Sequence, residues 1–62
     1  MTTRARELYK LRVSLGLTQH EASEAAGVKL STWVKWEQGI NDPSDRFYYP
    51  AIEALRRKEN KR

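Results

Sequence analysis

Glycine spacing constrains the fold of this chain more than any other feature of its sequence. Gly27 separates residues 18–26 from residues 30–38, and Gly16 and Gly39 stand at the outer ends of these two segments. Glycine readily adopts the left-handed conformation that ends a helix, so each of these positions is a natural helix boundary. The spacing therefore predicts two short helices hinged on Gly27, with further chain on either side to pack against them.

The segment before Gly16 has the pattern of an amphipathic helix. Three leucines recur at spacings of three and four residues, the period of one helical face: Leu8, Leu11 and Leu15. This pattern predicts a helix over residues 4–15, capped by Thr2 or Thr3. The apolar Leu17 can fold back over the last turn, as in a Schellman motif.

The segment after Leu17 begins with a capping box. The Thr18 hydroxyl can accept a hydrogen bond from the Glu21 amide while the Glu21 carboxylate reaches back to the Thr18 amide, which indicates the start of a helix. The inner positions of this helix, Ala22 and Ala26, are small, so another backbone can approach closely. We expect both alanines in the core.

Residues 30–38 form the most informative helix. A projection at about 100° per residue puts Trp33, Trp36 and Glu37 on one side. The opposite side carries charged, polar and apolar groups: Ser31, Val34, Lys35 and Gln38. Because two tryptophans require burial, we expect the mixed side to face solvent.

The last part of the chain predicts a loop and one more helix. Residues 41–45 have the composition of a turn, and Pro50 suits the first turn of a helix that buries Ile52 and Leu55. Three aromatic residues precede this proline: Phe47, Tyr48 and Tyr49. We expect them mainly in the core, because exposed aromatics would form a sticky patch. The alternative places one of them at a dimer interface.

Together these segments predict an all-α fold, a compact bundle of four helices with five helices as the alternative. The predicted core draws apolar side chains from every helix: Leu8, Leu11, Leu15, Ala22, Ala26, Trp33, Trp36, Ile52 and Leu55. With 62 residues, the chain is expected to form a single domain, residues 1–62, and to bury only about 60% of its unfolded surface. Residues 56–62 are almost wholly polar and are expected to form a solvated basic tail.

Charge and composition narrow the classes of function. Twelve Lys and Arg against eight Asp and Glu give a net charge of +4, which favours a polyanionic partner. The absence of cysteine excludes disulfides and thiolate metal sites. No apolar stretch approaches the roughly 18 residues that a membrane span needs. We therefore expect a cytoplasmic protein with no membrane partner.

No constellation of residues predicts catalysis, a metal site or a cofactor. His20 is the only histidine and has no second nitrogen or sulfur ligand near it in the sequence, so we expect a solvent-facing side chain. Glu21 and Glu24 share a helix face, as a pair of catalytic carboxylates could, but a chain of this size has little room for a pocket. We expect no enzymatic activity, no cofactor and no small-molecule ligand.

Three motifs in fixed order carry a resemblance to a known family. They are Leu-Gly-Leu-Thr-Gln at residues 15–19, Ala-Gly-Val at residues 26–28 and Trp-Glu-Gln-Gly at residues 36–39. With these motifs, most of the chain resembles the lambda-repressor-like, Cro/XRE-type helix-turn-helix DNA-binding domain. The resemblance implies a helix-turn-helix core at residues 18–39 whose second helix reads bases in the major groove of double-stranded DNA.

The resemblance also implies roles for individual residues. It pairs Arg12 with Glu37 in a structural bridge, and it places a large ring, Trp33, where the family usually has a small aliphatic residue. The base-reading positions that it implies are Lys29, Leu30, Ser31 and Lys35. We add Val34, because its side chain can contact a thymine methyl group. The expected phosphate contacts lie at the start of the first helix of the core and around the end of the second: Thr18, Gln19, Gln38, Asn41 and Arg46.

The expected function is sequence-specific transcriptional regulation, most simply by a small repressor or autorepressor of a phage, plasmid or other mobile element that occludes its operator. Base contacts worth about 1 to 3 kcal/mol each favour a homodimer on a palindromic operator. One alternative is a DNA-binding antitoxin of a toxin–antitoxin pair, which the polar C-terminal segment does not favour. The other is a protein-interaction module on the same fold. Ser31 and Lys35 do not favour it, because such a module is expected to have an acidic or bulky apolar outer side on this helix.

Overall fold

The computed structural model describes residues 3–59, and over this range the chain is helical apart from short connections. Four helices follow one another: α1 (Thr3–Ser14), α2 (Gln19–Ala26), α3 (Leu30–Gln38) and α4 (Asp45–Glu59). Among the described residues there is no strand, and no helix is long and apolar enough to cross a membrane. The predicted all-α fold of four helices is confirmed. Residues 60–62 of the predicted basic tail lie outside the described range.

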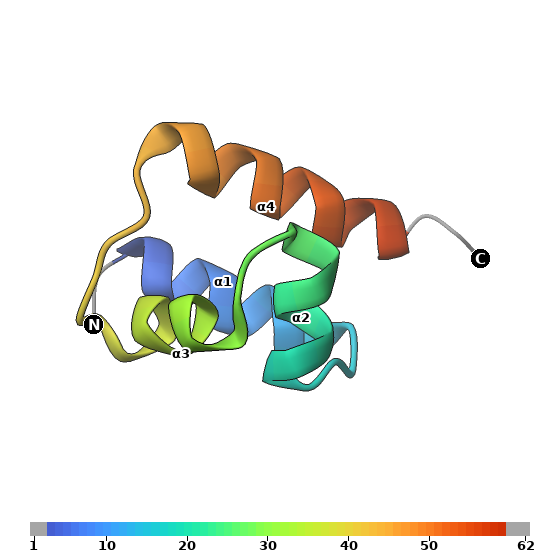
Figure 1. The fold of residues 1–62 in the computed structure, drawn as a ribbon. Coiled ribbons are helices and arrows are strands. Elements are labelled where there is room, and N and C mark those ends of the chain that lie inside the picture. Colours follow the sequence, from blue (N-terminus) through green and yellow to red (C-terminus); the bar gives the residue numbers. More distant parts are fainter. Residues whose placement is uncertain (1–2, 60–62) are drawn as a thin grey trace.

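The helices pack around an apolar core. Both α1 and α2 contact α3 and α4. Figure 1 shows α4 along one side of the bundle and α3 along the other, with α1 visible between them and α2 at one end. The buried cluster contains side chains from all four helices: Leu8, Ala22, Trp33, Trp36, Ala51 and Leu55.

The side chains predicted for the core all lie in this cluster or against it. The rest of the predicted set is half-buried and packs on its edge: Leu11, Leu15, Ala26 and Ile52. Ala51 belongs to the core although no sequence pattern singled it out.

Helix α1 begins and ends one residue earlier than the leucine pattern predicts. Thr3 is already part of the helix, so the cap position falls on Thr2, which lies outside the described residues. At the other end Gly16 has a φ of 71°, and its amide donates to the Val13 carbonyl at 3.0 Å. The Leu17 amide donates to the Arg12 carbonyl at 3.1 Å. These two bonds form the predicted Schellman motif.

The turn between α2 and α3 depends on Gly27. This residue has a φ of 74°, in the left-handed region that residues with a side chain rarely adopt. Its amide donates to the Glu24 carbonyl at 3.2 Å, and the Val28 amide donates to the Ser23 carbonyl at 3.0 Å. The hinge predicted at Gly27 is confirmed, and α3 starts after Lys29, whose side chain makes no capping hydrogen bond.

The capping box predicted at the start of α2 is confirmed. The Glu21 amide donates to Thr18 Oγ1 at 3.1 Å, and the Thr18 amide donates to Glu21 Oε1 at 2.9 Å. The backbone hydrogen bond from Thr18 lowers the pKa of the Glu21 carboxyl, and the Thr18 side chain lowers it further. The carboxylate therefore favours folded α2 above its ordinary pKa, and this contribution is lost as the pH falls through the lowered value.

We expect Thr18→Ala to lower the free energy of unfolding by about 1 kcal/mol, the usual cost of losing an N-cap side chain. For a domain of this size the melting temperature would fall by about 4 to 8 °C, which circular dichroism would measure. Ser14→Ala is the matched control, because the exposed Ser14 hydroxyl donates only back to the Leu11 carbonyl of its own helix. Equal melting temperatures for Thr18→Ala and the wild-type protein would contradict the role of the capping box.

The start of α4 corrects the prediction that the last helix begins near Pro50. The helix begins at Asp45, and Pro50 lies inside it. The Ser44 carbonyl accepts hydrogen bonds from the amides of Phe47 at 3.0 Å and Tyr48 at 2.8 Å, so the first turn forms before the proline. A proline inside a helix removes one N–H donor and its ring crowds the carbonyl four residues earlier, so α4 forms in spite of Pro50.

Contacts with α1 stabilise this first turn of α4. Arg4 donates to the Pro43 carbonyl at 2.9 Å and forms an ion pair with Asp45. Its guanidinium lies 4.6 Å from the centre of the Tyr48 ring. Pro43 and Asp45 are 39 and 41 residues from Arg4 in the sequence, so no local pattern indicated these contacts.

The prediction that the aromatic residues of α4 lie mainly in the core is wrong. Phe47 is 51% exposed and Tyr49 is 60% exposed, whereas Tyr48 is half-buried against the core. Because a helix has 3.6 residues per turn, successive side chains point about 100° apart and three in a row cannot all face inwards. A dimer interface that includes one of these rings stays a prediction.

Candidate nucleic-acid interface

The inner side of α3 anchors this helix to the rest of the fold. Trp33 is completely buried, and Trp36 and Glu37 are each 5% exposed. The two indole rings lie 5.9 Å apart, centre to centre, in a tilted arrangement. This burial is the one that the helical projection of residues 30–38 predicts.

Glu37 connects three helices. Arg12 Nε donates to Glu37 Oε2 at 2.6 Å and Arg12 Nη2 donates to Oε1 at 3.1 Å, which makes a bidentate ion pair between α1 and α3. From α2, Gln19 Nε2 donates to Glu37 Oε1 at 3.3 Å, and the Trp33 indole N–H donates to Oε2. The bridge that the resemblance implies is therefore present in the structure, and it joins α3 to α1 and α2.

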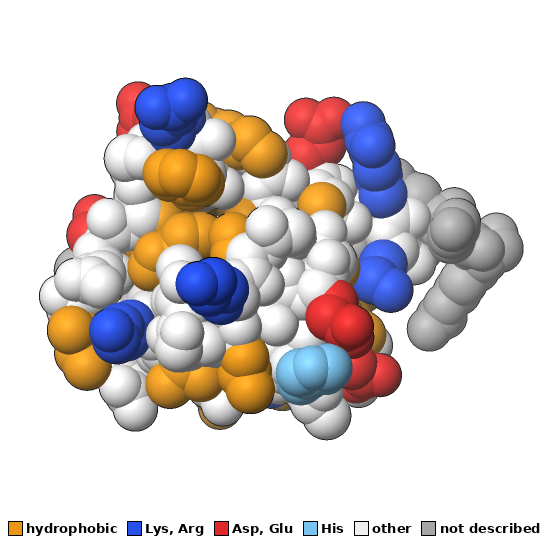
Figure 2. All heavy atoms as spheres, in the orientation of Figure 1, with side chains coloured by type: hydrophobic (Ala, Val, Ile, Leu, Met, Phe, Trp, Pro, Cys, Tyr) orange, Lys and Arg blue, Asp and Glu red, His pale blue; other side chains and the backbone are white. Residues whose placement is uncertain are grey.

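The outer side of α3 is accessible to a partner. Ser31, Lys35 and Gln38 are exposed, as is Lys29 at the helix cap. Leu30 is 43% exposed, and Val34 is half-buried. Figure 2 shows cationic side chains standing among apolar and uncharged ones over this helix. The structure thus places every predicted base-reading side chain on one short helix and its cap.

The start of α2 offers backbone amides to an anion. The first amides of a helix have no acceptor within it, and the capping box satisfies those of Thr18 and Glu21. The amides of Gln19 and His20 remain, at the positive end of the helix dipole. Because the Gln19 side chain is half-buried and donates to Glu37, its backbone amide is the freer donor toward a phosphate.

The other predicted phosphate contacts lie at the end of α3 and beyond it, and all are exposed: Gln38, Asn41 and Arg46. Two carboxylates, Asp42 and Asp45, are exposed in the same segment. Arg4 forms an ion pair with Asp45 and so reduces its effect on a nearby phosphate. Asp42 remains as the carboxylate that weakens the attraction of this segment for a nucleic-acid backbone.

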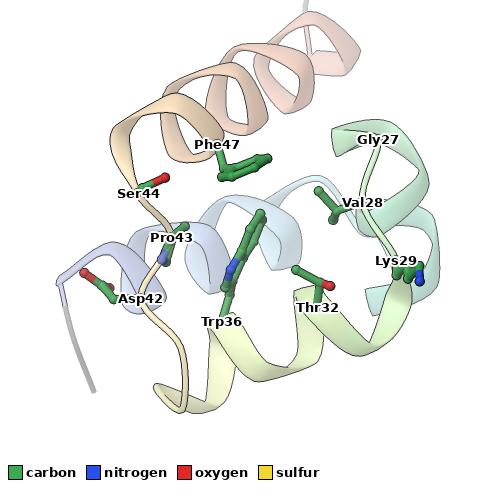
Figure 3. Close-up of a pocket in the computed structure, with 9 residues that line it drawn as sticks. All are labelled: Gly27, Val28, Lys29, Thr32, Trp36, Asp42, Pro43, Ser44 and Phe47. Carbon is green, nitrogen blue, oxygen red and sulfur yellow. The ribbon is translucent and has the colours of Figure 1, made fainter.

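A groove that sequence analysis did not predict separates α3 from the start of α4. Its volume is about 580 Å³, and its lining comes from the turn before α3, from α3 itself and from the connection to α4. Figure 3 shows the Phe47 ring over the end of the Trp36 ring, with Thr32 beside them. The two ring centres are 6.5 Å apart. The sequence pattern placed Phe47 in the core and assigned no role to Thr32, so it did not indicate a groove.

Other candidate chemical groups lie at the surface of α2. His20 Nδ1 is 3.4 Å from Glu24 Oε1, and both side chains are more than half exposed. Glu21 belongs to the capping box. Within residues 3–59, no group of three His, Asp or Glu side chains is arranged to hold a metal ion.

A short helix, a tight glycine turn and a second helix with one buried and one exposed side define a DNA-binding domain of the helix-turn-helix class. Residues 5–62 match the family described as helix-turn-helix domain. The chain therefore belongs to the helix-turn-helix domain family, in agreement with the Cro/XRE-type resemblance. Comparisons with curated proteins and with solved structures gave no match.

Proposed function

We propose that this protein is a sequence-specific transcriptional regulator that binds double-stranded DNA through the outer side of α3. The observation that carries the proposal is the opposition of the two sides of this helix. Glu37 and both tryptophans are buried on the inner side of α3, so Ser31 and Lys35 on its outer side face solvent. Lys35 can donate to guanine O6 or N7, and Ser31 can donate or accept a hydrogen bond.

The proposed mode of action is repression by occlusion of the operator, through binding alone and without a catalytic step or a cofactor. One helix supplies only a few base contacts, each worth about 1 to 3 kcal/mol. Selecting an operator among genomic sites takes about 4 to 10 kcal/mol over non-specific binding. We therefore propose a homodimer on a palindromic operator, because two copies double the number of base contacts.

Selection from a pool of random duplexes tests this function. The selection is made at about 0.15 M salt with excess competitor DNA, because a basic protein binds any duplex at low salt. Enrichment of a palindromic sequence is the expected result. Equal binding of all sequences at this salt concentration would contradict the proposed function.

We expect Lys35→Ala and Arg46→Ala to have different effects on DNA binding, although each removes one cation from an exposed side chain. Lys35→Ala should cost about 1 to 3 kcal/mol on the selected operator and relax the preference at one base pair. Arg46→Ala should weaken binding to all duplexes alike and reduce the slope of log affinity against log salt by about 1. Fluorescence anisotropy over a salt series, on the operator and on a scrambled duplex, measures both effects.

The scrambled duplex separates base reading from phosphate binding. If Lys35→Ala weakened the operator and the scrambled duplex by the same factor, Lys35 would be a phosphate contact and its base-reading role would be wrong. Arg46→Ala serves as the matched control for the loss of one positive charge.

A further inference from the structure

One edge of the outer side of α3 is apolar. Leu30 and Val34 stand one helical turn apart, with Leu30 43% exposed and Val34 half-buried. Side chains four residues apart lie next to each other on a helix surface, so the two form a continuous apolar strip. Burial against a partner would remove this strip from water, which favours binding by about 25 cal/mol per Å² of apolar surface.

The charges around this strip are those that a polyanion requires. Lys29 and Lys35 are exposed on the same helix and its cap. The only carboxylate of α3 is Glu37, which is turned inwards and paired with Arg12. The outer side of α3 therefore presents cations and no carboxylate, and this charge pattern favours a polyanion such as DNA over a neutral or basic protein surface.

Leucine and valine can neither donate nor accept a hydrogen bond, so they can distinguish bases only by apolar contact. In the major groove the apolar group of a base pair is the methyl group on C5 of thymine. A cytosine that is methylated on C5 carries the same group at the corresponding position. A strip of two apolar side chains thus selects a methyl group, whichever pyrimidine ring carries it.

We propose that Leu30 and Val34 read the C5-methyl groups of pyrimidines in the operator, so that both thymine and 5-methylcytosine are favoured over cytosine at the contacted positions. The inference rests on the proposed function. Four residues of helix rise by about 6 Å, and base pairs are about 3.4 Å apart. The two contacts are therefore expected within about two base-pair steps of each other in each half-site.

Replacing thymine by uracil in the selected operator tests this inference with the wild-type protein. Deoxyuridine keeps the base pair and removes only the methyl group. At the contacted positions we expect about fourfold weaker binding per methyl group lost, and no change at other thymines. Cytosine in place of a contacted thymine should bind more weakly still, and 5-methylcytosine should recover about fourfold of that loss.

Two variants assign the effect to the strip. Leu30→Ala and Val34→Ala should each abolish the difference between thymine and uracil at one position while binding the rest of the operator. Ile40→Ala is the matched control, because Ile40 is 65% exposed and lies beyond the end of α3. Melting curves establish that each variant is folded.

Two outcomes would count against different claims. If the selection enriches an operator but uracil binds as well as thymine at every position, the reading of methyl groups is wrong and the proposed function stands. If no duplex is enriched, the proposed function itself fails and the methyl inference fails with it.

Discussion

Arg12→Ala is expected to unfold a large fraction of the protein at room temperature. The substitution leaves Glu37, which is 5% exposed, without its ion-pair partner. Removing one partner of a buried ion pair costs about 3 to 5 kcal/mol, because the other charge stays in a poorly solvated site. The apolar core of a domain this small supplies only about 3 to 5 kcal/mol of net stability. The expected loss in the free energy of unfolding is therefore comparable to the whole stability of the domain.

Urea denaturation followed by circular dichroism gives the change in the free energy of unfolding. We expect a loss nearer to 3 than to 5 kcal/mol, because Glu37 keeps the hydrogen bonds from Gln19 and Trp33. Arg57→Ala is the matched control: it breaks an ion pair with Glu53 in which both side chains are more than two thirds exposed. Exposed pairs contribute about 0 to 1 kcal/mol, so this variant should remain close to the wild-type protein.

A double variant tests whether the unpaired charge of Glu37 causes the loss of stability in Arg12→Ala. Glu37→Gln in the Arg12→Ala background removes the charge and keeps an oxygen that accepts the Trp33 N–H. We expect the double variant to be more stable than Arg12→Ala alone, since a buried neutral amide costs less than an unpaired carboxylate. If Arg12→Ala melted at the same temperature as Arg57→Ala, the bridge would not stabilise the fold.

Local sequence patterns predicted the parts of the fold that local contacts determine. The capping box at Thr18 and the turn at Gly27 each form from residues that are close in the sequence. The two sides of α3 follow from helical periodicity and the size of the tryptophans. These features position the candidate site, so the sequence alone is sufficient to locate its main helix.

The features that sequence analysis did not predict depend on contacts between distant segments. The early start of α4 is supported by Arg4, whose partners lie about 40 residues away. The groove beside Trp36 forms because Phe47 is brought over α3 from a different helix. The side-chain contact of Gln19 with Glu37 also joins two helices, and it changes which atom of Gln19 is free to meet a phosphate.

Trp33→Ala is expected to have an effect at least as large as that of Arg12→Ala. Trp33 is the largest completely buried side chain of the described residues. Small side chains on α2 make room for it, since Ala22 is buried in the same cluster and Ala26 packs against it. Truncating a buried tryptophan costs about 3 to 5 kcal/mol, and this small domain has few other apolar contacts with which to fill the cavity.

Circular dichroism should therefore show a large loss of helix in Trp33→Ala at 25 °C, without a cooperative melting transition. Trp33→Phe keeps one aromatic ring in the core and removes the N–H donor to Glu37 together with part of the indole volume. A hydrogen bond to a charged group is worth about 1.5 to 3 kcal/mol, and Arg12 and Gln19 continue to donate to the Glu37 carboxylate. Because the cavity left by the phenyl ring is small, we expect a loss well below that of Trp33→Ala. Tyr49→Ala, which truncates a ring that is 60% exposed, is the control for removal of an aromatic side chain and should fold normally. If Trp33→Phe unfolded as fully as Trp33→Ala, the packing of one aromatic ring at this position would not be sufficient to hold α3 in place.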